Sequence, residues 1–200
     1  MTKPYSESCD QNCEPILAVI QTLLADKQAV LEIGSGTGQH AVYFARKLPH
    51  LIWHTSDRAE YHAGICQWLH ETGLDNTPDP VTLDVSHSDW PALTIDVVFT
   101  ANTAHIMHDK DVAAMLAGVG RLLAGDGLFI LYGPINYNQQ YTSESNRHFD
   151  GWLKNRDPLS GIPDFEKLDS NAAQASLLLK DDHPMPANNR ILVWQKKSTG

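Results

Sequence analysis

The sequence is poor in cysteine, and its cysteines do not form a pattern typical of disulfide-bonded or metal-binding proteins. The sequence has only three cysteines in 200 residues, Cys9, Cys13 and Cys66. Domains that depend on disulfide bonds are small and rich in cysteine. The CxxxC spacing of Cys9 and Cys13 matches neither a redox CxxC motif nor the half-site of a zinc finger. We therefore expect reduced thiols and no metal site.

Positive charge is also scarce. Fifteen lysine and arginine residues stand against 24 acidic residues, which gives a formal net charge of −9. Nucleic-acid-binding proteins use a stripe of lysine and arginine to neutralise phosphates, so a nucleic-acid partner is disfavoured. An acidic surface suits a neutral or cationic small ligand better.

Long apolar runs are missing as well. No stretch has the roughly 20 apolar residues that a membrane helix needs, and residues 1–15 lack the apolar core of a signal peptide. We expect no membrane partner and a cytoplasmic location. The hydrophobic fraction of 42% is typical of a globular protein, and the length fits one domain, residues 1–200.

What is present is an alternation of apolar runs and helical patterns. The apolar runs predict strands at 29–33, 51–57, 81–85, 95–100 and 128–132, and the helical spacing predicts helices at 15–24, 39–48, 61–72 and 111–123. Near-continuous apolar strands that alternate with helices indicate an α/β fold with a parallel sheet covered on both faces.

The pattern changes after Gly133-Pro134. Residues 135–165 are polar and irregular, which is typical of a lid or a substrate-facing insert. A helix is expected at 165–175. The runs 177–180 and 190–195, separated by a turn-rich segment, predict an antiparallel hairpin at the edge of the sheet.

One segment carries a motif, Glu32-Ile33-Gly34-Ser35-Gly36-Thr37-Gly38. Glycines after a first strand let the backbone turn tightly and approach a ligand. The spacing ExGxGxG differs from the GxGxxG of dinucleotide-binding loops, which argues against a nicotinamide oxidoreductase. In a dinucleotide complex, Glu32 would lie close to the anionic pyrophosphate and repel it. A carboxylate at this position instead suits a ligand with an ammonium group.

Two more acids follow at strand ends. Asp57 ends the second strand, from which a carboxylate can bind both hydroxyls of a ribose. Asp84 follows the third strand and can accept a hydrogen bond from an adenine amine, while Val85 packs on the ring. Any one of these acids can be an ordinary surface residue, but the three together favour a site for an adenosyl amino acid.

With these motifs the sequence resembles the class I S-adenosylmethionine-dependent methyltransferases: Val30–Gly38 is the first motif, Asp57 the second and Asp84-Val85 the third. More narrowly, it is similar to a family of short, functionally uncharacterised methyltransferase-like proteins of bacteria and animals. That similarity covers nearly the whole chain and rests on Pro15-Ile16-Leu17, Glu32–His40, Tyr132-Gly133-Pro134, Thr142–Asp150, Arg156-Asp157-Pro158 and Met185–Asn189.

The resemblance implies a Rossmann-like, mostly parallel seven-stranded sheet with an antiparallel C-terminal edge hairpin, and S-adenosyl-L-methionine as cofactor. The expected cofactor-binding residues are Glu32, Gly34, Ser35, Gly36, Thr37, Gly38, Asp57, Asp84, Val85 and Asn102. One departure is Gln11-Asn12, which stands where the family typically has Arg-Asn just before the first helix. Loss of that arginine would affect acceptor choice or affinity, but not the fold.

By analogy of fold, Thr100, Asn102, Thr103 and His105 face the methionine part of the cofactor. His105 is the candidate general base and Tyr132 a second catalytic candidate, at the end of the fifth strand. The alternatives are that His105 and His108 are ordinary loop residues, or that they hold a metal ion, for which no third ligand has suitable spacing.

Residues of the insert are expected to wall the acceptor pocket: Tyr137, Tyr141, Ser145, Asn146, Arg147, Asp150, Arg156 and Asp157. For Arg156-Asp157 an ion pair that pins the lid is slightly favoured, and Phe149, Trp152 and Phe165 are favoured as lid core over ligand-stacking residues. Asn188-Asn189 lies in the final hairpin loop, where closure over the same pocket and a turn stabilised by asparagine side chains are equally good interpretations. The sequence predicts a methyltransferase with a small-molecule acceptor; the alternative is a non-catalytic S-adenosylmethionine sensor or interaction protein.

Overall fold

A single seven-stranded sheet forms the centre of the protein in the computed structural model, which describes residues 3–198. The strand order is β3-β2-β1-β4-β5-β7-β6. The strands are β1 (Ala29–Ile33), β2 (Ile52–Asp57), β3 (Val81–Thr82), β4 (Val97–Ala101), β5 (Leu128–Pro134), β6 (Leu177–Met185) and β7 (Asn189–Lys196).

Parallel pairing joins the first five strands. β1 pairs with β2 on one side and with β4 on the other, and β4 pairs in parallel with β5. All residues of β1, β4 and β5 are buried, because helices cover both faces of the sheet. This confirms the predicted α/β class, and it explains why these strands consist of continuous apolar runs.

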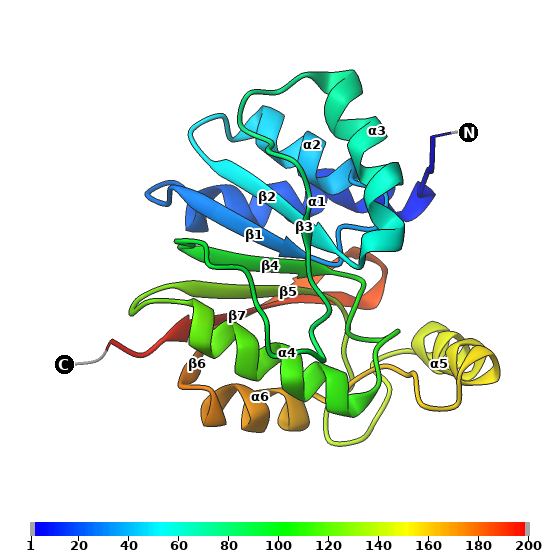
Figure 1. Cartoon of the computed structure of the whole chain (residues 1–200). Helices are drawn as coiled ribbons and strands as arrows, with labels where there is room; N and C mark the ends of the chain where they lie inside the picture. Colours follow the sequence, from blue (N-terminus) through cyan, green and yellow to red (C-terminus); the bar gives the residue numbers. More distant parts are fainter. Residues whose placement is uncertain (1–2, 199–200) are drawn as a thin grey trace.

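The described residues form six α-helices, of which five pack against the sheet. α1 (Glu7–Leu23), α2 (Gln39–Lys47) and α3 (His62–Thr72) pack on one face, while α4 (Asp109–Leu122) and α6 (Phe165–Gln174) pack on the other (Figure 1). Each face has its own core, one around Phe44, Trp53 and Phe99 and the other around Met115 and Phe129. α5 (Glu144–Arg156) lies apart, beyond the carboxyl ends of the parallel strands (Figure 1).

The C-terminal hairpin completes the sheet. β7 pairs antiparallel with both β5 and β6, so the last strand in sequence lies inside the sheet and β6 forms its edge. The predicted antiparallel edge hairpin is confirmed. Strand β6 is longer than the predicted 177–180 and runs to Met185 past a register shift between Leu179 and Asp181, and the connection is only the short turn Pro186–Asn188.

Two other boundaries differ from those predicted by more than two residues. The first helix begins at Glu7, not at Pro15, because Ser6 caps it by accepting a hydrogen bond from the N–H of Cys9 at 3.4 Å. Pro15 therefore lies inside the helix, and Gln11-Asn12 belongs to the helix instead of preceding it. Strand β3 has two residues where five were expected, because Leu83 to Val85 continue past the end of β2 without a neighbouring strand.

No helix among the described residues has both the length and the apolar character required to cross a membrane.

Candidate functional site

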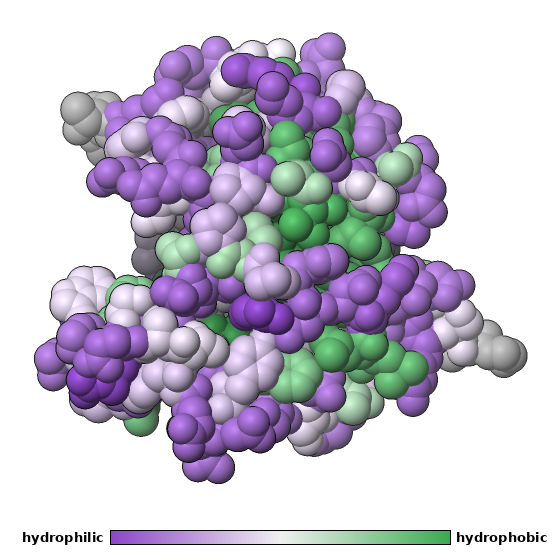
Figure 2. Space-filling model, turned by 180° about the vertical axis from the view of Figure 1, so that it is seen from behind, coloured by the Kyte–Doolittle hydropathy of each residue, from purple (hydrophilic) through white to green (hydrophobic). Residues whose placement is uncertain are grey.

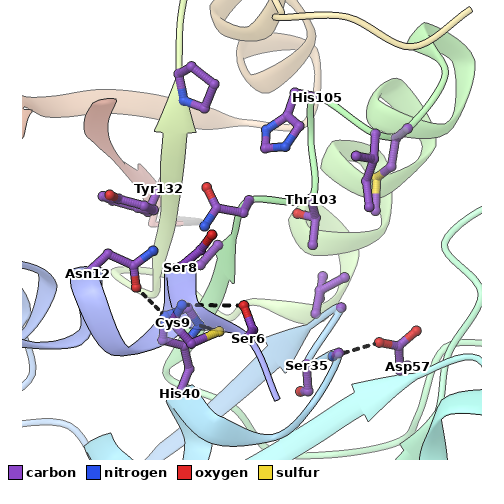
Figure 3. A pocket seen from close by; sticks show the side chains of 18 of the residues that line it. Ser6, Ser8, Cys9, Asn12, Ser35, His40, Asp57, Thr103, His105 and Tyr132 are labelled. Atoms are coloured by element: carbon purple, nitrogen blue, oxygen red, sulfur yellow. Dashed lines mark hydrogen bonds between the residues drawn. The ribbon is translucent and has the colours of Figure 1, made fainter. Parts of the chain in front are cut away.

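A cavity of about 1030 Å³ opens at the carboxyl ends of the parallel strands. Its walls come from the loop after β1, the ends of β2, β4 and β5, the first turns of α1, the helix α5 and the turn before β7. In Figure 2 an indentation of the outline separates α5, at the lower left, from the upper part of the molecule. Figure 3 shows side chains from these elements pointing toward one space.

The glycine loop is the part of the wall that the sequence predicts best. Gly34 and Gly36 have left-handed backbones, with φ of +70° and +58°. A Cβ at Gly34 would lie 2.4 Å from Cγ2 of Thr103, whereas one at Gly36 would meet nothing closer than the carbonyl oxygen of Gly34 at 4.0 Å. The lack of a side chain at Gly34 therefore lets the loop pack closely against Thr103. At Gly36 it leaves open space above the loop. Ser35 and Thr37 also line the cavity.

Two of the three predicted acids, Asp57 and Asp84, line the cavity, as does Val85. Asp57 accepts hydrogen bonds from the backbone N–H groups of Gly36 at 2.9 Å and Arg58 at 2.8 Å, and burial raises its pKa. Asp84 uses Oδ1 to accept from the backbone and hydroxyl of Ser86. Those bonds lower the pKa of Asp84, so it remains a carboxylate.

The third acid, Glu32, which the sequence predicts as a ligand contact, is not part of the cavity wall. Alternation along β1 turns its side chain into the core, where it is 1% exposed and Oε2 accepts from the indole N–H of Trp53 at 3.1 Å. Burial raises its pKa to about 7. Its carbonyl oxygen instead supports the loop, since it accepts from the hydroxyls of Ser56 at 2.7 Å and Ser35 at 3.4 Å.

Gly38 also lies off the cavity. Its backbone is left-handed at φ +89°, and a Cβ there would approach Cα of Ile65 to 3.3 Å. The third glycine of the motif therefore allows α2 to begin close against α3, which is a packing role.

A buried polar cluster lies beneath the loop and was not predicted. Nε2 of His40 is 2.6 Å from Oδ1 of Asn12, and Nδ1 of His40 is 3.8 Å from Sγ of Cys9 and 4.0 Å from Oε1 of Glu32 (Figure 3). Burial lowers the pKa of His40 to about 4, so the ring is neutral at pH 7. Because the pKa of Glu32 is raised, a neutral pair is favoured here over an ion pair.

The segment after β4 brings three of its four predicted residues to the cavity. Asn102, Thr103 and His105 line it, while Thr100 is fully buried and donates to the carbonyl oxygen of Ile33 at 2.9 Å. Asn102 has a left-handed backbone at φ +58°, and its N–H donates to the carbonyl oxygen of Tyr132 at 2.9 Å. An asparagine tolerates this conformation better than most residues.

His105 points into the cavity (Figure 3). Its ring makes an edge contact with Phe149, with centroids 5.2 Å apart, and hydrogen-bonds to no side chain that the structure describes. Burial lowers its pKa to about 4, so a neutral imidazole faces the cavity at pH 7. Tyr132, the other catalytic candidate, also lines the cavity, and burial raises its pKa.

Only part of the insert reaches the cavity. Ser145, Asn146 and Asp157 line it, and so does Phe149, which the sequence favoured as lid core. The others hold the lid together or tie it to the sheet: Tyr137 to Asp182, Tyr141 and Lys154 to Asp150, Arg147 to Glu144, and Arg156 over the ring of Trp152.

Hydrogen bonds at both ends attach α5 to the body. Asp157 lies 2.8 Å from Nε2 of His108, so the partner of Asp157 is His108 and not Arg156. At the other end, Asn146 donates to the carbonyl oxygen of Asn188 at 3.2 Å. Asn189 also lines the cavity, so the hairpin turn does take part in the wall.

The first turns of α1 form a wall that sequence reasoning missed. Ser6, Ser8, Cys9, Gln11 and Asn12 line the cavity. Gln39 attaches this end of α1 to the glycine loop, because its side-chain oxygen accepts from the N–H of Ser6 at 2.6 Å and its amide donates to Asp10 at 2.9 Å. The one signal for this wall was the position of Gln11-Asn12, which the resemblance linked to acceptor choice or affinity.

The charges on the wall are mainly negative. Within residues 3–198, the carboxylates on the wall are Asp57, Asp84, Asp111 and Asp157, and the only lysine or arginine is Arg58. Arg58 pairs with Glu60 at 3.3 Å and directly follows Asp57, on the side of the glycine loop. The wall therefore suits a ligand that carries positive charge, and among the described residues it offers no lysine or arginine away from the glycine loop.

Three solved methyltransferase structures have a similar architecture. Mitomycin 7-O-methyltransferase MmcR matches with a TM-score of 0.83 and 16% identity, over 94% of this chain and 54% of its own. An O-methyltransferase family 2 protein from Planctomyces limnophilus, in complex with apigenin, has a TM-score of 0.75 and 17% identity, over 84% and 50%. Human N-acetylserotonin methyltransferase, in complex with SAM, has a TM-score of 0.80 and 14% identity, over 96% and 53%.

The chain spans about half the length of these structures. Likeness at this identity shows the fold, which is the Rossmann-like fold of class I methyltransferases with a mostly parallel seven-stranded sheet. The family model described as "Protein of unknown function (DUF938)" matches residues 3–196, and the chain therefore belongs to that family.

Proposed function

We propose that the protein binds S-adenosylmethionine and transfers its methyl group to a small, uncharged acceptor. The observation that carries the proposal is the glycine loop, which is open above Gly36 and joined to the carboxylate of Asp57 by a 2.9 Å hydrogen bond. It faces a cavity whose charged wall residues are mainly acidic, which suits a ligand with sulfonium and ammonium groups. The solved methyltransferases of the same fold support the proposal.

The wall residues fit each part of this cofactor. Asp57 would accept from the ribose hydroxyls, Asp84 has Oδ2 available for the adenine amine, and Val85 would pack on the ring. Asn102 would bind the amino-acid end. When bound, the cofactor supplies an electrophilic methyl group on a sulfonium. Glu32 has no direct contact in this arrangement and acts through its carbonyl oxygen beneath the loop.

The remainder of the cavity fits a second reactant. About 1030 Å³ lies at the upper end of the roughly 300–1,000 Å³ of small-molecule sites. The wall away from the loop contains Tyr132, Asn12, Asn146 and the ring of Phe149. These groups bind neutral polar and aromatic surfaces, and no described lysine or arginine is there to pair with a phosphate or carboxylate. A neutral hydroxyl compound is the acceptor that this wall suits best.

His105 is positioned to receive the proton that a hydroxyl acceptor loses. Its low pKa keeps the ring neutral at pH 7, but it also makes the ring a weak base. Most of the rate enhancement must then come from alignment of the two reactants in a closed site. Such alignment can lower the activation barrier by about 7–11 kcal/mol. Contacts from α5, through His108–Asp157 and Asn146–Asn188, would help to exclude water.

Calorimetry with S-adenosylmethionine tests the first half of the proposal, and absence of binding heat would overturn it. The second half is tested by release of S-adenosylhomocysteine with two sets of acceptors. One set contains neutral phenols, with apigenin as the first probe, and the other contains phenols with a carboxylate or phosphate. Turnover confined to the neutral set is expected, whereas binding without any turnover would favour the non-catalytic sensor.

A further inference from the structure

Three side chains with metal-binding atoms meet on the outer side of α3, away from the cavity. Cys66 and His70 are four residues apart in α3, so they project from the same face of the helix. Asp79 comes from the loop between α3 and β3, and its Oδ1 lies 3.5 Å from Nε2 of His70. One ligand atom from each of the three lies within 4.8 Å of the other two.

This donor set and spacing match zinc. Tetrahedral zinc binds cysteine sulfur at about 2.3 Å and histidine nitrogen or carboxylate oxygen at about 2.0–2.2 Å. Ligand atoms around such an ion are therefore about 3.3–3.6 Å apart. The separation of 3.5 Å between His70 and Asp79 already has this value, and a sulfur within 4.8 Å needs only a side-chain rotation to complete the set.

The backbone holds the three ligands in place. Two of them are fixed by one helix, and the third is flanked by Pro78 and Pro80, whose rings restrict the loop. The side chains of His70 and Asp79 are 72% and 87% exposed, so an ion can reach them from solvent. We propose that Cys66, His70 and Asp79 form a zinc site with a fourth position open to water.

The site has a structural consequence at the edge of the sheet. β3 pairs with β2 through only two residue pairs, Ser56 with Val81 and Asp57 with Thr82. A metal bound by Asp79 and α3 would hold the loop that leads into this short strand. None of the three ligands lines the cavity, so the inference is independent of the function proposed above. Zinc here stabilises the edge strand and takes no part in the reaction.

Cobalt(II) tests the site, because it substitutes for zinc and gives a near-ultraviolet charge-transfer band when a thiolate binds it. The purified full chain is titrated with Co²⁺ and then with Zn²⁺, which should displace the band. Cys66→Ser should abolish the band, while Cys9→Ser should retain it; Cys9 is the matched control because its Sγ also lies near a histidine. A band that survives Cys66→Ser, or one that disappears in Cys9→Ser, overturns the proposal.

Two further variants change exposed side chains, so they should not disturb folding. His70→Asn and Asp79→Asn should each weaken zinc binding at least tenfold, measured by competition with a chromogenic chelator. In the parent, zinc at about a hundredfold excess over its Kd should raise Tm by about 5 °C or more. Parent-like zinc affinity in both variants, or no rise of Tm in the parent, would refute the site.

Discussion

The backbone N–H of Gly36 donates a 2.9 Å hydrogen bond to Oδ2 of Asp57, which ends the neighbouring strand. Oδ1 of the same carboxylate accepts from the N–H of Arg58 at 2.8 Å. Asp57 therefore fixes the shape of the glycine loop while it faces the cavity. A ligand that binds there meets a carboxylate whose orientation is already set by the backbone.

The charge and the hydrogen bond of Asp57 can be separated by two substitutions. Asp57→Asn retains an oxygen that can accept from Gly36 but loses the charge, whereas Asp57→Ala loses both. We expect the Kd for S-adenosylmethionine to rise about tenfold in the first and about a hundredfold in the second, since a hydrogen bond to a charged group contributes about 1.5–3 kcal/mol. Calorimetry measures both, with exposed Asp89→Asn as control, and equal affinity in all four proteins would contradict this role.

Glu32 gives a prediction about pH. Its pKa of about 7, against 4.5 normally, means that the folded state keeps a proton that the unfolded state releases. The resulting stability is present below pH 4.5 and is lost as the pH rises through 7. Glu32→Gln, which cannot ionise, should therefore raise Tm by about 5 °C at pH 8 and have little effect at pH 4.5.

Thermal unfolding of Glu32→Gln is compared with that of Glu14→Gln, which removes an exposed acid from α1. The control should show no such pH dependence. Calorimetry on the same variant separates the two interpretations of Glu32. A contact with the cofactor's ammonium group predicts a loss of affinity, whereas the position below the loop predicts affinity within about threefold of the parent. A large loss would restore the interpretation based on the sequence.

Substitution of His105 should slow methyl transfer. His105→Asn should lower kcat about ten- to a hundredfold, toward the lower range for a general base, and should leave the Kd for S-adenosylmethionine unchanged. The neutral ring is the active form and its pKa is about 4, so the parent's rate should be maintained from pH 8 to pH 5 and fall near pH 4. A loss of rate centred near pH 6.5 would assign the base to another group.

Gly34 and Thr103 should be coupled. Gly34→Ala places a Cβ 2.4 Å from Cγ2 of Thr103 in a left-handed backbone, which we expect to cost about 2 kcal/mol or more in the free energy of unfolding. Thr103→Ser removes Cγ2 and keeps the hydroxyl that bonds Thr100. Denaturant unfolding of the double variant should recover about 1 kcal/mol. Additive effects would show that the contact is not the cause.

The central strands were predictable because their physical environment is simple. Ala29–Ile33 was predicted to the residue, since a strand buried on both faces must be apolar throughout. The start of α1 was missed because its first turns face a cavity and solvent, so they carry no apolar repeat. Strand β6 was predicted too short because it is an edge strand, where polar residues such as Asp181 and Asp182 are tolerated.

The site was predictable in position more than in orientation. Sequence places Glu32, Asp57 and Asp84 near strand ends, but which way a side chain turns depends on neighbours far away in the chain. The carboxylate of Glu32 points into the core, where the indole of Trp53, 21 residues away in the chain, donates a hydrogen bond to it. Asp79 likewise joins Cys66 and His70 only after the loop has folded back beside α3. His105 lines the cavity because it lies in the segment that follows the carboxyl end of β4.

The position of β7 has a consequence for synthesis on the ribosome. β5 acquires its second neighbour only when β7 has inserted between it and β6. Until residues 189–196 have left the exit tunnel, the apolar run Leu128–Tyr132 has one unpaired side. A nascent chain therefore cannot close its sheet before these residues have emerged, and until then it presents an open strand edge on which chaperones or aggregation can act.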